Sequence, residues 1–185
     1  MTYSTALRYV RAWGAILATA LLASCATMTP EECKVANWSE VGLRDGLRGA
    51  ATSVLDDRVK DCAEAKVPVD TRSYFQGRAQ GLQSYCRIEN AAGYGLDGKT
   101  YYGVCPATMD GEFRRRFEMG SQVRQRRADV QTLDTRLEPL EKSLKDAKND
   151  DERKKIREEL RDLDRDLRRA RDRLREAEWS LGQLR

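Results

Sequence analysis

Residues 38–49 read WSEVGLRDGLRG, and residues 74–86 read YFQGRAQGLQSYC. Each stretch has two glycines four residues apart, a leucine after the second glycine, and an aromatic residue upstream. Residues four apart share one face of a helix, where an interior glycine costs about 0.5 to 1 kcal/mol relative to alanine. A face of glycines therefore indicates that another backbone packs closely against it, and we predict two helices that cross on these faces. The glycines are Gly42, Gly46, Gly77 and Gly81, and the bordering aromatic residues are Trp38, Tyr74 and Tyr85.

The stretch between the two glycine faces predicts one more helix. A break is expected at residues 49–52, and Ser53 can cap the next helix. Val67-Pro68-Val69 ends that helix, because proline cannot continue one. Asp70 or Thr71 is the expected cap of the helix with the second glycine face.

Residues 93–106 no longer follow the helical spacing of the preceding segments and read GYGLDGKTYYGVCP. The dipeptide Asp97-Gly98 lies between β-prone residues, which is typical of a type I′ turn. We therefore predict a small two-stranded β-hairpin here. A lone hairpin is marginally stable in water, so a disulfide through Cys105 is expected to hold it.

Four cysteines follow residue 30, namely Cys33, Cys62, Cys86 and Cys105. An even number in an exported small domain predicts two disulfides. Cys86 is the natural partner of Cys105, which leaves Cys33 with Cys62 and requires a bend near Gly49. The pairing of Cys33 with Cys86 and Cys62 with Cys105 stays open. We expect no metal site, because the chain has no histidine and no Cys-x-x-Cys pair.

The first 24 residues have the composition of an export signal. Arg8 and Arg11 precede an apolar run, residues 13–23, that is too short to span a bilayer. The run ends in Leu22-Ala23-Ser24-Cys25, which resembles the lipobox of bacterial lipoproteins. That resemblance implies cleavage before Cys25, which then carries a diacylglycerol and further fatty acid such as palmitate. It also implies a membrane as a partner, because several fatty chains anchor a protein stably.

Residue 26 bears on which membrane holds the protein. Aspartate after the cysteine would resemble the retention signal of the inner membrane, whereas this chain has Ala26. We therefore expect a cell-envelope protein on an outer-membrane lipid anchor, facing the periplasm.

The C-terminal part predicts a coiled coil. Apolar residues recur in alternating steps of three and four along two arms, apart from Arg126 in the first arm. The first arm has Val123, Val130, Leu133, Leu137, Leu140, Leu144 and Ala147, and the second has Ile156, Leu160, Leu163, Leu167, Ala170, Leu174, Ala177, Leu181 and Leu184. The two arms are of similar length, which favours an antiparallel hairpin, and residues 149–151 supply its turn. Pro139 should kink or weaken the first arm. A long helix that dimerises with a phase slip is the alternative.

Arginines recur at every fourth position of the second arm, at Arg157, Arg161, Arg165, Arg169 and Arg173. An anionic partner could offset their mutual repulsion. Acidic residues three positions before several of these arginines favour a face that neutralises itself.

Composition narrows the function classes. The chain is 35% charged with a net charge of only +4, and both signs are interspersed, so we expect no nucleic-acid partner. The missing histidine removes the usual general base near neutral pH, and no motif for a nucleotide or cofactor is present. The carboxylates Asp45 and Asp97, with Glu89 nearby in sequence, are the best candidates for acid and base chemistry. However, Asp-Gly is more often a cap or a turn.

The family resemblance rests on aromatic, glycine and cysteine positions in order: Trp38, Gly42, Asp45, Gly46, Gly49, Cys62, Tyr74, Gly77, Gly81, Leu82, Tyr85, Cys86, Gly98, Tyr101, Cys105, Pro106, Phe113 and Gly120. Over roughly residues 33–120 the chain resembles a bacterial lipoprotein family that is catalogued only as a domain of unknown function. Members often carry a histidine four residues before the first helical cysteine, where this chain has Arg58. The resemblance implies a location and no reaction.

The expected fold is mainly α: a small disulfide-stapled helical domain with a β-hairpin, followed by a long coiled-coil helical hairpin. The expected parts are a signal (1–24), a lipidated N-terminus and linker (25–36), a helical domain (37–120) and the coiled-coil arm (121–185). We expect a non-catalytic protein without a cofactor that is structural or binds a protein partner through its arm. The alternative is an enzyme or ligand-binding module acting on cell-envelope material. Its candidate residues are Trp38, Asp45, Gly46, Tyr74, Gly77, Gly81 and Asp97.

Overall fold

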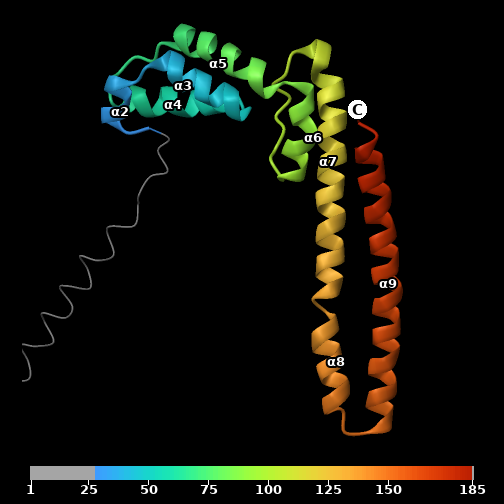
Figure 1. Cartoon of the computed structure of the whole chain (residues 1–185). Coiled ribbons are helices and arrows are strands. Elements are labelled where there is room, and N and C mark those ends of the chain that lie inside the picture. Colours follow the sequence, from blue (N-terminus) through green and yellow to red (C-terminus); the bar gives the residue numbers. More distant parts are fainter. Residues whose placement is uncertain (1–27, 185) are drawn as a thin grey trace, which may run out of the picture. The chain divides into compact units, whose positions relative to one another are not determined.

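The computed structural model describes residues 28–184, and within them every regular element is an α-helix (Figure 1). The predicted export signal and Cys25 lie outside the described residues. The helices are α2 (Pro30–Val35), α3 (Trp38–Arg48), α4 (Ser53–Glu64), α5 (Thr71–Tyr85), α6 (Ile88–Leu96), α7 (Ala107–Asp134), α8 (Leu137–Asp146) and α9 (Asp150–Gly182). The mainly helical fold is therefore confirmed.

The described residues divide into two compact units: residues 28–36 with 52–69, and residues 37–51 with 70–184. In the first unit, a disulfide between Cys33 and Cys62 joins α2 to α4, with the Cα atoms 5.6 Å apart. We predicted a linker over residues 25–36, but residues 30–35 form α2. The helix begins there because Thr29 and Glu32 form a capping box around Pro30.

In the second unit, α3 packs against α5. The predicted break after α3 is present, and Gly49 there has a φ of 64° that glycine adopts without strain. Asp70 caps α5 as predicted, because its carboxylate accepts from the backbone N–H of Ser73 at 3.0 Å. The predicted cap at Ser53 is wrong. Ser53 is the first helical residue of α4, and Thr52 before it makes no side-chain cap bond.

The predicted β-hairpin is also wrong, because no strand occurs between residues 28 and 184. Residues 93–96 complete α6, and Asp97-Gly98 ends that helix. Gly98 has a φ of 72°, its N–H bonds the carbonyl of Gly95 at 3.0 Å, and the N–H of Lys99 bonds the carbonyl of Tyr94 at 3.0 Å. This is a Schellman motif. Because it needs the same left-handed glycine as a type I′ turn, the dipeptide alone does not distinguish the two.

The second disulfide joins Cys86, directly after α5, to Cys105, shortly before α7, with the Cα atoms 5.6 Å apart. Both disulfides thus follow the first of the two pairings considered. The sulfurs lie in a core with Tyr85, Ala91 and Phe113, against which Tyr94 and Tyr101 also pack.

A second glycine contact joins α6 to α7. A Cβ on Gly95 would lie 2.0 Å from the carbonyl oxygen of Phe117, and a Cβ on Gly120 would lie 2.1 Å from that of Ala92. Only glycine at these positions lets the two backbones approach so closely.

Beyond this contact, α9 runs back alongside α7 and α8, as Figure 1 shows. The chain turns between Asp146 and Asp150, where the side chain of Asn149 caps α9. The kink that we predicted from Pro139 is a break between α7 and α8 at Thr135 and Arg136. A proline ring clashes with the carbonyl four residues before it, which for Pro139 is that of Thr135.

Two ion pairs show the register of this hairpin. Arg127 of α7 contacts Glu178 of α9 at 2.8 Å, and Asp134, one heptad further on, contacts Arg171, one heptad earlier. Equal steps in opposite directions require antiparallel helices. The buried residues of α9 are Ile156, Leu163, Leu167 and Ala170, all from the predicted seam. Among residues 28–184, no helix is long and apolar enough to cross a membrane.

Candidate functional site

The contact between α3 and α5 contains most of the candidate residues. A Cβ on Gly42 would lie 1.9 Å from the carbonyl oxygen of Tyr74, and one on Gly46 would lie 2.3 Å from that of Arg78. From the other side, a Cβ on Gly77 would lie 1.8 Å from the carbonyl oxygen of Ser39. Gly81 faces the backbone of α3 in the same way. The predicted crossing on glycine faces is therefore confirmed.

A buried hydrogen bond links the two helices beside these glycines. The hydroxyl of Tyr74, which is fully buried, donates to Oδ2 of Asp45 at 2.8 Å, and Asp45 is only 3% exposed. Trp38, at the start of α3, is buried as well. A carboxylate buried without partners is costly, so this bond offsets part of the cost of burying Asp45.

Arg78 is a buried charged residue that our sequence analysis missed. Its side chain is 5% exposed, and Nη2 donates to the carbonyl oxygen of Ala50. Its Nε has no hydrogen-bond partner among residues 28–184. The available signal was spacing, since Arg78 follows Tyr74 by one helical turn and so shares its buried face.

The carboxylates proposed for acid and base chemistry lie in different surroundings. Asp45 is buried between α3 and α5, whereas Asp97 is exposed at the end of α6. Glu89 is exposed in the first turn of α6 and contacts Arg87 at 2.6 Å. Hydrogen bonds from its own backbone and from Arg87 hold the pKa of Glu89 below its usual value. None of these hydrogen bonds joins one of the three carboxylates to another.

A polar cluster lies beside the Cys86–Cys105 disulfide. The hydroxyl of Tyr101 donates to Asp110 and accepts from the backbone N–H of Cys105 at 3.3 Å. Arg114 contacts the other oxygen of Asp110 at 3.3 Å. Burial and then the bond to Asp110 raise the pKa of Tyr101 to about 12, while the bond from Tyr101 lowers the pKa of Asp110. This cluster connects the segment before α7 to the first turns of α7.

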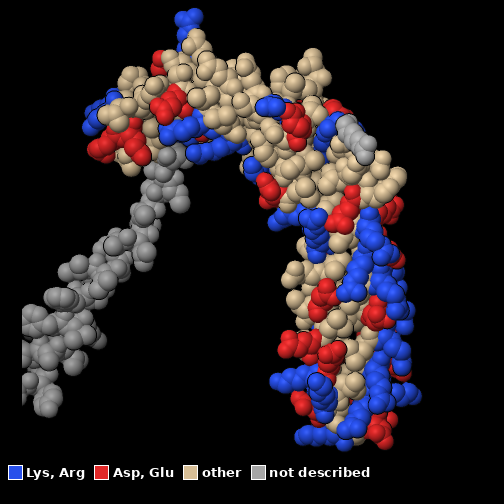
Figure 2. Space-filling model, viewed as in Figure 1, with Lys and Arg blue, Asp and Glu red and all other residues tan. Residues whose placement is uncertain are grey.

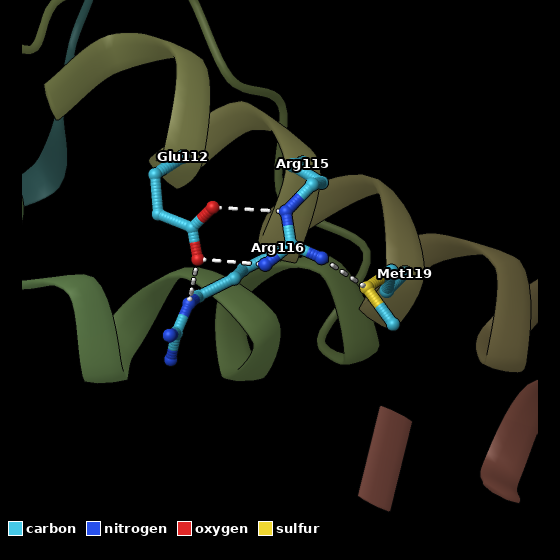
Figure 3. Close-up of polar contacts among 4 residues, drawn as sticks. All are labelled: Glu112, Arg115, Arg116 and Met119. Atoms are coloured by element: carbon cyan, nitrogen blue, oxygen red, sulfur yellow. Dashed lines mark hydrogen bonds and ion pairs between the residues drawn. The ribbon is translucent and has the colours of Figure 1, made fainter. Parts of the chain in front are cut away.

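Two residues after Asp110 on α7, Glu112 accepts from both Arg115 and Arg116, as Figure 3 shows. These two bonds lower the pKa of Glu112 to about 2. Arg115 also reaches the sulfur of Met119 at 3.8 Å. Because every residue in this cluster comes from one helix, it stabilises the surface of α7 and forms no pocket of its own.

Loss of the hydroxyl group should change the free energy of unfolding differently at two tyrosines of this region. Tyr85 is 1% exposed and its hydroxyl has no hydrogen-bond partner among residues 28–184, whereas Tyr101 bonds Asp110. Tyr85→Phe should therefore leave the free energy of unfolding unchanged or raise it slightly, and Tyr101→Phe should lower it by about 1 to 2 kcal/mol. Urea unfolding of the two variants measures both values. An equal loss in both variants would contradict this assignment.

In residues 28–184, no group of three or more His, Cys, Asp or Glu side chains is arranged to hold a metal ion. The buried polar groups of α3 and α5 instead bond to each other and to the backbone. The bond between Tyr74 and Asp45 joins α3 to α5.

Searches of curated proteins and of solved structures each find no match to this chain. Residues 37–122, which contain α3 to α6 and the first part of α7, match the model of a family described as "Protein of unknown function (DUF2799)".

Proposed function

We propose that this chain is a non-catalytic lipoprotein of the bacterial cell envelope. A lipid on Cys25 holds it at the outer membrane, facing the periplasm, and residues 121–185 form an arm that is structural or binds a protein partner.

The observation that carries this proposal is the pair of disulfides. Cys33–Cys62 and Cys86–Cys105 each join segments that are distant in sequence, and all four cysteines are buried. Disulfides of this kind persist in the periplasm and are rare in the cytosol. An oxidising compartment is also the one to which an export signal before Cys25 would deliver the chain.

The buried polar groups support a binding or structural role over catalysis. Asp45, the best acid and base candidate, is almost fully buried and bonded to Tyr74. Glu89 lies in the first turn of α6, and Asp97 is the residue at which that helix ends. The arm, by contrast, exposes long helical faces, and Trp179 on α9 is 68% exposed.

The anchor is tested by Cys25→Ala in a bacterial host. The unchanged chain should fractionate with membranes and should have a mature mass that includes fatty acid. The variant should lose that mass and appear in the soluble periplasmic fraction. If the variant stays in the membrane fraction with an unchanged mass, the proposed anchor is wrong.

The arm is tested by truncation after Arg127. The truncated chain retains Gly95, Gly120 and Arg124, so it keeps the contacts between α6 and α7 around these residues. Cross-linking in intact cells followed by pull-down should recover a partner with the full chain and not with the truncated one, while both remain in membranes. Recovery of the same partner by both chains would place the binding surface outside the arm.

A further inference from the structure

Basic residues recur at every seventh position on the outward face of α9. Buried Ile156, Leu163 and Ala170 recur every seven residues and face the other arm. A residue two positions earlier lies about 200° around the helix and so faces outward. The outward residues before these three and before Ala177 are all basic and exposed: Lys154, Arg161, Arg168 and Arg175. We call these four residues the α9 basic line.

The line is straight and spaced regularly. Seven residues along a helix span about 10.5 Å, and a heptad repeat keeps them on one face of a coiled coil. Trp179 lies four residues beyond Arg175, about 40° around the helix, and is 68% exposed. Figure 2 shows Lys and Arg side chains following α9 along the visible face of the hairpin.

The acidic neighbours of the α9 basic line leave its positive side chains exposed and able to bind an anion. On α9 itself, Arg161 contacts Glu158, Arg168 contacts Asp164 and Arg175 contacts Asp172. More than half of each of these arginine side chains is nevertheless exposed. Ion pairs this exposed contribute little to stability. An arginine guanidinium has five N–H donors, so it can bind a phosphate while it still contacts the carboxylate. The neutralised face predicted from sequence is present at Arg161, Arg165 and Arg169, which pair with Glu158, Asp162 and Asp166. Arg161 therefore belongs both to that face and to the basic line. All four positions of the α9 basic line are basic, so no acidic residue interrupts it.

We infer that the α9 basic line and Trp179 bind the surface of a bilayer that contains anionic phospholipids. A straight row of cations matches a flat layer of phosphate groups, and lysines and arginines near such a layer are attracted to it. Tryptophan is enriched at the boundary between lipid and water, where its ring is partly in the apolar region. Binding of this face leaves the outward faces of α7 and α8 for a protein partner. The inference rests on the proposed location beside a membrane.

The test uses residues 26–185, which keep every described helix and both disulfides but have no lipid. The probe is vesicles of equal parts phosphatidylcholine and phosphatidylglycerol, with phosphatidylcholine alone as the neutral comparison. We expect co-sedimentation with the anionic vesicles only, a shift of tryptophan emission to shorter wavelength, and weaker binding at high salt. Trp38 is buried, so the shift reports on Trp179.

Two variants that each remove four positive charges distinguish the effect of the α9 basic line on vesicle binding from the effect of net charge. The line variant replaces Lys154, Arg161, Arg168 and Arg175 with Gln. The control variant replaces Arg136, Lys142, Lys145 and Lys148, which are exposed on or next to α8, with Gln. We expect at least a tenfold loss of vesicle affinity in the line variant and less than a threefold loss in the control, with unchanged circular dichroism in both.

Several results would overturn the inference. They are absence of binding to anionic vesicles, equal losses in both variants, or full binding by the line variant. Binding to polyglutamate without binding to vesicles would assign the line to an acidic protein instead. Because the tested chain has no lipid, none of these results bears on the Cys25 anchor, which its own variant tests.

Discussion

Gly77→Ala is expected to lower the free energy of unfolding of the α3–α5 region by about 3 kcal/mol, because the added methyl group would overlap a backbone atom. That atom is the carbonyl oxygen of Ser39, 1.8 Å from the position of the new Cβ. A backbone oxygen inside a helix cannot move as a flexible side chain can. The two helices must therefore separate, which also strains the buried bond between Tyr74 and Asp45. Urea unfolding followed by circular dichroism measures the loss.

Gly93→Ala is the matched control, because it makes the same change inside another helix. Apart from its chain neighbours and the nearby backbone of its own helix, no atom lies within 4 Å of a Cβ at Gly93. Alanine there should raise the free energy of unfolding by about 0.5 to 1 kcal/mol, since it reduces the backbone freedom of the unfolded chain. Similar effects of the two substitutions would show that the glycine faces are not what joins α3 to α5.

Removal of the Cys86–Cys105 disulfide by replacing both residues with alanine is expected to cost about 3 kcal/mol, as for a loop of this length. The bond closes a loop with a sequence separation of 19 and lies in the core with Tyr85 and Phe113. The near-ultraviolet circular dichroism of these packed aromatic rings should therefore weaken along with the thermal midpoint.

The double alanine variant of Cys33 and Cys62 is the comparison for this experiment. That disulfide belongs to the unit of α2 and α4, and the aromatic core belongs to the other unit. Its removal should lower the stability of α2 and α4 and leave the near-ultraviolet signal of the aromatic core largely intact. An unchanged thermal midpoint after removal of Cys86–Cys105 would contradict a structural role for that bond.

The features predicted correctly from sequence depend on spacing within one helix. Gly42 and Gly46 indicated the crossing of α3 and α5 because a four-residue repeat already defines a face. The seam of α9 followed from its heptads for the same reason. The two disulfides could be expected from the even number of cysteines, and the sequence favoured the pairing that is found. Deciding between this pairing and the alternative required the positions of the helices, because spacing alone left both open.

The features predicted wrongly depend on choices that local sequence does not decide. Asp97-Gly98 suits a hairpin turn and a helix end equally well, and packing of Gly95 against α7 decides for the helix. The capping box of Thr29 and Glu32 was visible in the sequence, although α2 is short and depends on its disulfide to α4. Arg78 was missed because burial of a charge depends on tertiary contacts.

Residues 107–184 fold back on themselves within a single chain, which leaves the outer faces of the arm free to bind. Light scattering of residues 26–185 over a wide range of concentration tests whether this hairpin forms within one chain. We predict the mass of one chain at every concentration, because α9 already fills the seam of α7 and α8. A stable dimer would contradict the intrachain hairpin and would favour one long helix that pairs with a second copy.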